Sequence, residues 1–156
     1  ILRPGGVVIE DLRAIIPQVQ LTPKYLEPTI NTPSPGQMLK HYSPDARVML
    51  FCGDDDARVI AHMQDNANRL TSAHKRVGIL VTDEDAPHFE GLGVVKTVGN
   101  RTNLNAISHS LFAMIRILDG LQVDVILVRD FGRNGLGAAL WDRLLRAAEG
   151  QVIRVE

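Results

Sequence analysis

Residues 47–70, with the sequence RVMLFCGDDDARVIAHMQDNANRL, contain the pattern of a strand followed by a helix. Arg47–Cys52 is a short, mainly apolar run with little polar alternation, which is typical of a strand covered on both faces of a sheet. After an acidic turn, apolar side chains recur at helical spacing, at Val59, Ile60, Met63, Ala67 and Leu70. Asp54 or Asp55 is placed to cap this helix. The stretch therefore predicts one strand–helix unit of a parallel α/β fold.

The same alternation continues to the end of the chain. Further runs of strand length lie at Arg76–Thr82, Val94–Val98, Val123–Arg129 and Gln151–Val155. The whole order predicts an α/β fold, namely a three-layer Rossmann-like domain with a mostly parallel five-stranded sheet, over residues 46–156. The short connection from Thr82 to Val94 leaves the direction of one strand open.

Two further helices are expected from apolar faces that begin near Leu104 and Leu136. Thr102 or Asn103 is placed to cap the first of them, and Asn134 the second. Glycines stand where both helices are expected to end, at Gly120 and Gly150.

The first part of the chain has a different composition. Seven of the eight prolines lie in residues 1–44, and each one removes a backbone donor and disfavours helix before it. We therefore expect residues 22–45 to form an extended, proline-rich linker. Residues 1–21 begin like the tail of a strand and continue into a short amphipathic helix that Pro17 stops. This opening, without Met, indicates a piece of a longer chain.

Composition excludes several classes of protein. A length of 156 residues predicts about one compact domain. The 17 basic and 18 acidic side chains give a net charge of -1, so we expect no strong direct nucleic-acid binding. The single cysteine, Cys52, excludes an internal disulfide and argues against a structural metal, which fits a cytoplasmic location. No apolar run approaches the length that spans a bilayer.

Polar residues at the carboxyl ends of the predicted strands are the candidate ligand contacts, because open parallel sheets bind ligands there. The acidic runs Asp54–Asp56 and Asp83–Asp85 have the oxygen ligands of a Mg²⁺ site, although helix caps and solvated turns are favoured for them. Arg101 and Arg133 are candidate anion ligands, with solvated loops the favoured alternative. The glycine-rich run Gly132–Gly137 lacks the spacing of a phosphate loop, which favours a tight turn and close helix packing. No catalytic residue and no metal ligand is assigned.

The most unusual segment lies in the linker, where Ser34–Pro44 has the sequence SPGQMLKHYSP. A plain spacer is rich in Gly, Ser or charge, whereas this segment places Lys40, His41 and Tyr42 between prolines. A tyrosine can stack on a base, and a lysine supplies positive charge. From the residues alone, two interpretations are equally favoured. The segment either covers a bound nucleotide as a lid or packs on the protein in the ordinary way.

Several motifs in order resemble the threonylcarbamoyl-AMP synthase family. Ser34-Pro35-Gly36 and His41-Tyr42-Ser43-Pro44 are similar to its linker, with Ser43 in place of the usual Ala. Ile1–Gly5 resembles the closing strand and turn of its catalytic domain. Two helices of its C-terminal accessory domain are matched by Asn103–Asp119 and by Gly135–Leu144.

The resemblance implies a nucleotidyltransferase that joins L-threonine, bicarbonate and ATP into threonylcarbamoyl-adenylate and pyrophosphate for the threonylcarbamoyl modification of tRNA. It implies that Arg3 and Tyr42 contact ATP, with Lys40 and His41 as further lid contacts. ATP is then a substrate, with Mg²⁺ held by the complete enzyme. Residues 1–21 would be the end of a truncated α/β catalytic domain that is the main partner of this piece, and the piece alone would be inactive.

Two other classes of function stay open at this stage. The domain over residues 46–156 can be a free-standing small-ligand or nucleotide binding module that uses the strand ends. It can also be a protein-interaction domain without a ligand.

Overall fold

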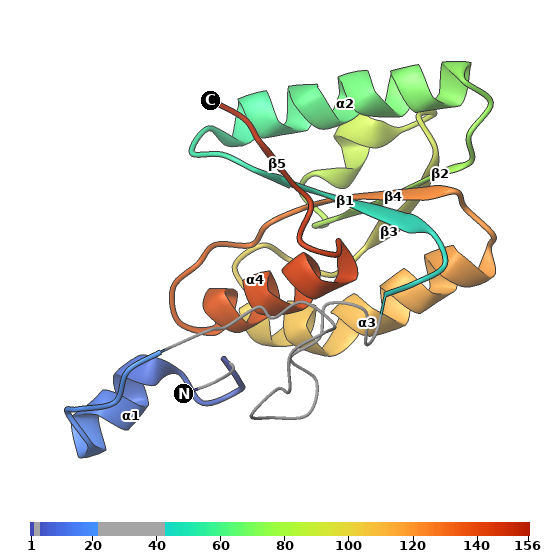
Figure 1. Ribbon diagram of the computed structural model, residues 1–156. Helices are drawn as coiled ribbons and strands as arrows, with labels where there is room; N and C mark the ends of the chain where they lie inside the picture. Colours follow the sequence, from blue (N-terminus) through green and yellow to red (C-terminus); the bar gives the residue numbers. More distant parts are fainter. Residues whose placement is uncertain (2–3, 22–42) are drawn as a thin grey trace.

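The computed structural model describes residues 1, 4–21 and 43–156. Among these, a five-stranded sheet is enclosed by helices on both faces, as Figure 1 shows. The strands are β1 (Arg47–Cys52), β2 (Val77–Val81), β3 (Val94–Thr97), β4 (Val125–Arg129) and β5 (Val152–Arg154). The helices are α1 (Ile9–Ile15), α2 (Asp56–Ser72), the 3-10 helix η1 (Ala86–Phe89), α3 (Leu104–Gly120) and α4 (Leu136–Ala147).

The sheet has the strand order β3-β2-β4-β1-β5, and all of its pairings are parallel. The expected α/β domain is confirmed, and the open direction of β3 is settled as parallel to β2. The chain returns between these two strands through η1, which is short enough to fit the brief connection. The three central strands bury almost every residue, which explains why their sequences lack polar alternation.

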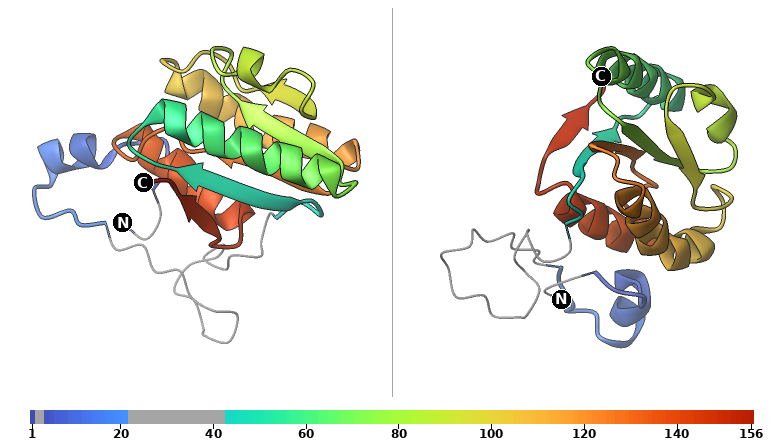
Figure 2. Two further views of the ribbon diagram at one scale, coloured as in Figure 1. Left: turned by 90° about the horizontal axis from the view of Figure 1, so that it is seen from above. Right: turned by 90° about the vertical axis from the view of Figure 1, so that its right-hand side faces the viewer.

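Each face of the sheet supports its own apolar core (Figures 1 and 2). On one face α2 and η1 pack on the sheet, with Met63 and Phe89 fully buried. On the other face α3 and α4 pack side by side, with Leu111 and Leu140 fully buried. Because β1 connects to α2 and β4 connects to α4, the loops that leave these neighbouring strands go to opposite faces.

The expected helix caps are partly confirmed. Asp55 accepts hydrogen bonds from the backbone N–H groups of Ala57 and Arg58 at the start of α2. Asn103 accepts one from Ala106 N–H at the start of α3.

One expectation about a helix cap was wrong. The residue before α4 is Gly135 rather than Asn134, with a φ of 54° and no side-chain cap, because the turn there requires the left-handed region that glycine enters freely. The expected end of α3 at Gly120 is confirmed, and the positive φ of the turn that follows falls at Gln122. The expected end at Gly150 is also confirmed, with a φ of 81° just beyond α4.

The N-terminal segment stands apart from the sheet, beyond α4 (Figures 1 and 2). The short helix expected there is confirmed as α1, but none of its residues is buried. Ile15 is 80% exposed and Ile16 is 52% exposed. A helix of a folded protein usually packs its apolar face against other residues, so an exposed apolar face of this kind is unusual.

A polar crevice and two linker anchors at the edges of the domain

A crevice of about 580 Å³ opens at the carboxyl ends of β1, β4 and β5. Its wall contains backbone of the loop after β1 and side chains that follow β4, and the charged lining residues are Asp54, Asp56, Arg129, Asp130, Arg133, Arg154 and Glu156. A smaller hollow of about 200 Å³ shares Asp56, Arg129 and Asp130 with it and reaches Arg101. In doubly wound sheets, ligands bind at strand ends where neighbouring connections leave to opposite faces, as those of β1 and β4 do here.

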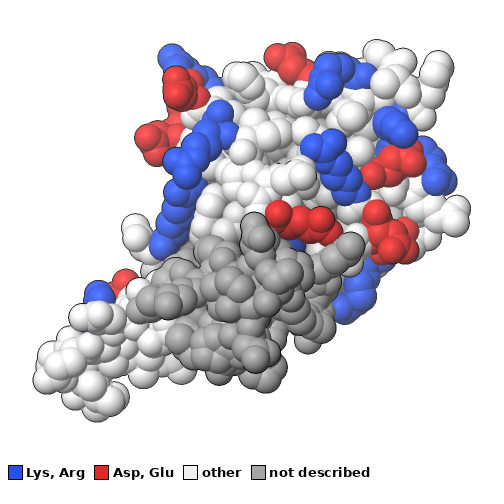
Figure 3. Space-filling model, in the orientation of Figure 1, with Lys and Arg blue, Asp and Glu red and all other residues white. Residues whose placement is uncertain are grey.

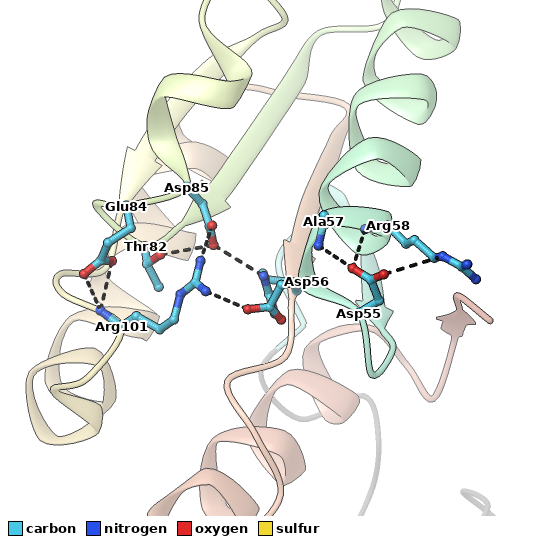
Figure 4. A network of polar contacts seen from close by, with 9 residues as sticks. Asp55, Asp56, Ala57, Arg58, Thr82, Glu84, Asp85 and Arg101 are labelled. Carbon is cyan, nitrogen blue, oxygen red and sulfur yellow. Dashed lines mark hydrogen bonds and ion pairs between the residues drawn. The ribbon is translucent and has the colours of Figure 1, made fainter.

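Four charged residues form a network beside the crevice (Figure 4), and two of them, Asp56 and Arg129, line it. Arg101 pairs with Asp56 at 2.6 Å and with Asp85. Arg129 pairs with Asp56 and lies 3.6 Å from Asp85. The side chains of Asp85 and Arg129 are 1% and 8% exposed, so these two charges are buried and depend on each other.

Loop residues orient this network. Thr82 donates from its hydroxyl to Asp85 at 3.1 Å. Both carboxylate oxygens of Glu84 accept from the backbone N–H of Arg101, at 3.2 and 3.0 Å. The hydrogen bond from its own backbone N–H lowers the pKa of Glu84; desolvation opposes this effect, and the hydrogen bond from the backbone N–H of Arg101 adds to it. The network therefore joins the starts of α2 and of the loop before α3 to the ends of β2 and β4.

The other side of the crevice is less completely paired. Asp130 is 13% exposed, and its ion pair with Arg133 is 3.7 Å long. Burial raises the pKa of Asp130, an effect that nearby arginines only partly offset. Arg133 also lies over the ring of Trp141, 4.0 Å from its centroid, which holds the guanidinium at the rim. Within the described part of the chain, Nη1 of Arg129 is buried without a hydrogen-bond acceptor.

Several charged residues predicted at the strand ends pair with one another. The solvated-loop alternative was wrong for Arg101, which is held by two carboxylates. Asp56 and Asp85 face arginines, and the described residues contain no cluster of His, Cys, Asp or Glu that could hold a metal ion. The packing interpretation of the glycine loop is confirmed, since a Cβ on Gly137 would lie 2.8 Å from the carbonyl oxygen of Gly132.

The site residues predicted in the linker and its flank, Arg3, Lys40, His41 and Tyr42, lie outside the described residues. The structure describes the residues on both sides of the linker, up to Leu21 and from Ser43 onward. The N-terminal segment lies at the start of α4, where Leu21 and Val8 line a mainly apolar hollow together with Gly135 and Ala138. A Cβ at Gly135 would lie 3.8 Å from Val8 Cγ1.

The far flank of the linker lies at the other end of the same helix. Ser43 donates from its hydroxyl to the carbonyl oxygen of Arg146 at 3.4 Å. Ala46 donates from its backbone N–H to Asp119 at 2.9 Å, which fixes the entry into β1. Both flanks of the linker are therefore anchored along α4, at opposite ends.

Both signs of charge are present on the face of the described residues that Figure 3 shows. Figure 3 shows lysines and arginines interspersed with aspartates and glutamates over the visible face. Among the described residues, no helix combines the length and apolar character needed to cross a bilayer.

A parallel α/β domain with a polar crevice at its strand ends belongs to the broad Rossmann-like class of ligand-binding folds. Residues 7–149 match the family model described as threonylcarbamoyl-AMP synthase, C-terminal domain, and the chain belongs to this family.

The chain is also similar to individual known proteins, both in sequence and in structure. The chain is 31% identical over 154 residues to the threonylcarbamoyl-AMP synthase of Bacillus subtilis, covering 99% of this chain and 43% of that protein. Its structure matches that of Sua5 from Pyrococcus abyssi complexed with L-threonine, with a TM-score of 0.86, 28% identity and coverage of 99% of this chain and 44% of that one. It also matches a variant of the P. abyssi protein with alanine in place of one histidine and the tyrosine after it, with a TM-score of 0.80, 26% identity and coverage of 99% and 42%. The chain thus spans less than half the length of these relatives.

Proposed function

We propose that this chain is the C-terminal part of a threonylcarbamoyl-AMP synthase and that it holds the linker as a lid over the nucleotide site of the catalytic domain. The complete enzyme would join L-threonine, bicarbonate and ATP into threonylcarbamoyl-adenylate and release pyrophosphate, as a step in threonylcarbamoyladenosine synthesis on tRNA. Family membership over residues 7–149 supports the assignment.

The geometry that carries the lid proposal is the pair of anchors on α4. From Gly135 to Arg146 the helix rises about 16 Å. Residues 22–42, fully extended, would measure about 70 Å. A chain of that length between flanks so close together can extend far beyond the domain surface, while hydrogen bonds of Ser43 and Ala46 hold its C-terminal flank. The linker therefore has the reach of a lid, and its attachment limits where the lid can go.

The residues proposed for the nucleotide are Arg3 and Tyr42, with Lys40 and His41 as further contacts. A guanidinium that is always charged suits a triphosphate, and a phenol ring can cover a base. Closure would exclude water from the labile adenylate. The P. abyssi variant that lacks a histidine and the tyrosine after it offers support, because His41-Tyr42 is the only His-Tyr pair in this chain.

We assign one role to each of the three predicted parts of the chain. Residues 1–21 are the end of the catalytic domain, residues 22–45 the lid, and residues 46–156 the accessory domain. The piece alone would not turn over substrate, because its ATP contacts cannot orient the reactants without the remaining site. Mg²⁺ would be held by the complete enzyme, and the location would be cytoplasmic. With a net charge of -1, this part would not bind tRNA strongly by itself.

Alanine variants of the two tyrosines in the complete enzyme test the lid. Tyr25 is the matched control, since both tyrosines lie in the linker and only Tyr42 belongs to the motif. We expect Tyr42→Ala to lower kcat/KM for ATP severalfold or more and Tyr25→Ala to leave it near the wild-type value. Equal kinetics for wild type and Tyr42→Ala would refute the lid.

A further inference from the structure

We propose that the crevice at the carboxyl ends of β1, β4 and β5 binds an α-amino acid, with the ligand's ammonium group on Asp130 and its carboxylate on Arg133 and Arg154. This site lies in the domain over residues 46–156 and does not depend on the proposed function. A volume of about 580 Å³ is ample for such a ligand and lies within the usual range of small-molecule sites.

The ion-pair network beside the crevice, which reaches it through Asp56 and Arg129, offers no net charge to a ligand. Asp56, Asp85, Arg101 and Arg129 contribute two carboxylates and two guanidinium groups that contact one another. These groups form a rigid wall, because separating any one of them would leave a poorly compensated charge beside the buried Asp85.

The remaining charged residues of the lining present both signs of charge and form few close ion pairs. Asp130 is mostly buried, and its nearest cationic partner, Arg133, stands at 3.7 Å, which is too long for a hydrogen bond. Asp54 and Arg154 line the same crevice and form no ion pair with any residue that the structure describes. A ligand here meets the mostly buried carboxylate of Asp130 and the more exposed guanidinium groups of Arg133 and Arg154.

Ligands with one sign of charge do not fit this arrangement. A phosphate would be attracted by Arg133 and Arg154, but the carboxylates of Asp54 and Asp130 would repel it. A divalent cation would face the arginines, and the described residues offer no cluster of metal ligands. An α-amino acid has an ammonium and a carboxylate one carbon apart, so it can satisfy both kinds of group at once.

NMR titration of the isotope-labelled 156-residue chain with each proteinogenic amino acid tests the proposal. We expect at least one amino acid to bind with a Kd of about 1 mM or tighter. The saturable shifts should be confined to amides around Gly53, Asp130–Arg133 and Arg154. The N-acetyl and the carboxamide derivatives of that amino acid should each bind at least about tenfold more weakly, because each lacks one charge.

Two pairs of variants locate the site. Asp130→Asn and Arg154→Gln should each abolish most of the binding, whereas Asp65→Asn and Lys75→Gln remove the same charges from exposed positions and should preserve it. Arg154 is exposed, so its replacement tests the site even if the Asp130 variant fails to fold. The proposal is overturned if no amino acid gives saturable shifts, if both derivatives bind as well as the amino acid, or if inorganic phosphate alone produces the same shifts.

Discussion

The domain over residues 46–156 and the segment over residues 4–21 differ most in what they bury. In the domain, strand residues such as Phe51 and Leu127 have no exposed surface, and two apolar cores enclose the sheet. In the segment, α1 buries none of its residues, and Ile15 is 80% exposed. Because burial of apolar surface is the main source of folding free energy, the domain has the means to fold alone and the segment does not. The comparison supports the proposal that α1 packs on a domain outside this chain.

The largest expected effect comes from removing a core side chain. Phe51→Ala deletes a fully buried ring from β1 and should lower the free energy of unfolding by about 3–5 kcal/mol. Ile15→Ala removes an exposed side chain and should change it by less than about 0.5 kcal/mol. Urea denaturation of the chain measures both values. If Ile15→Ala lowered the free energy of unfolding as much as Phe51→Ala does, the proposed difference in burial between the segment and the domain would be wrong.

A second contrast lies within the domain, between a buried and an exposed ion pair. Asp85→Asn removes the charge that faces Arg129 and Arg101 in a buried position, and should cost about 3 kcal/mol. Asp55→Asn keeps a helix cap and loses only the exposed pair with Arg58 at 3.5 Å, which should cost less than about 1 kcal/mol. Thermal unfolding compares the two variants. If they proved equally stable, the network would not be holding the strand ends together.

Close packing of the glycine loop predicts a smaller effect. A Cβ on Gly137 would meet the backbone of Gly132 at 2.8–2.9 Å, so Gly137→Ala should destabilise the chain by about 1–3 kcal/mol. A Cβ on Gly5, in the N-terminal segment, would have nothing within 4 Å, and Gly5→Ala should be nearly neutral. Chemical denaturation of both variants measures how much more tightly the domain is packed than the segment.

The smallest effect concerns pH. Burial raises the pKa of Asp130 above its usual 3.8, so the folded state binds this proton more tightly than the unfolded state does. Stability contributed by this group is therefore lost as the pH rises from about 3.8 through the raised pKa. Asp130→Asn should be slightly more stable than wild type at neutral pH, with a difference that disappears below the unfolded pKa. Denaturation midpoints across this range test the sign, and an opposite trend would contradict it.

The sheet domain was largely predictable because its sequence satisfies strand and helix periods locally. The apolar runs at Arg47–Cys52 and Val94–Val98 predicted their strands to within about a residue. Strand order was not predictable, since it depends on which helices cover which face. The missed cap before α4 has a similar origin, because the close approach of Gly137 to Gly132 dictates the turn and no local pattern reveals it.

The candidate site was only partly predictable. The strand-end rule identified the loops that carry Arg133, which lines the crevice, and Arg101, which lines the smaller hollow beside it. It did not identify Arg129 with Asp85 as a buried pair, because they end strands that become neighbours only through the order of the sheet. Arg154 was missed for the same reason, because β5 joins the crevice only through the order of the sheet. A single charged residue at the end of a short apolar run could still have marked it as a candidate ligand contact.

The most direct test is amide hydrogen exchange, measured in this chain and in the complete enzyme. It shows whether residues 1–21 require another domain for a stable fold while residues 46–156 do not. We expect amides of β1 and β4 to exchange at the same slow rates in both proteins. We expect the amides of Leu12 and Ile16, which donate within or just after α1, to be protected at least about tenfold more in the complete enzyme. Equal protection of these two amides in both proteins would show that α1 gains no packing from the rest of the enzyme.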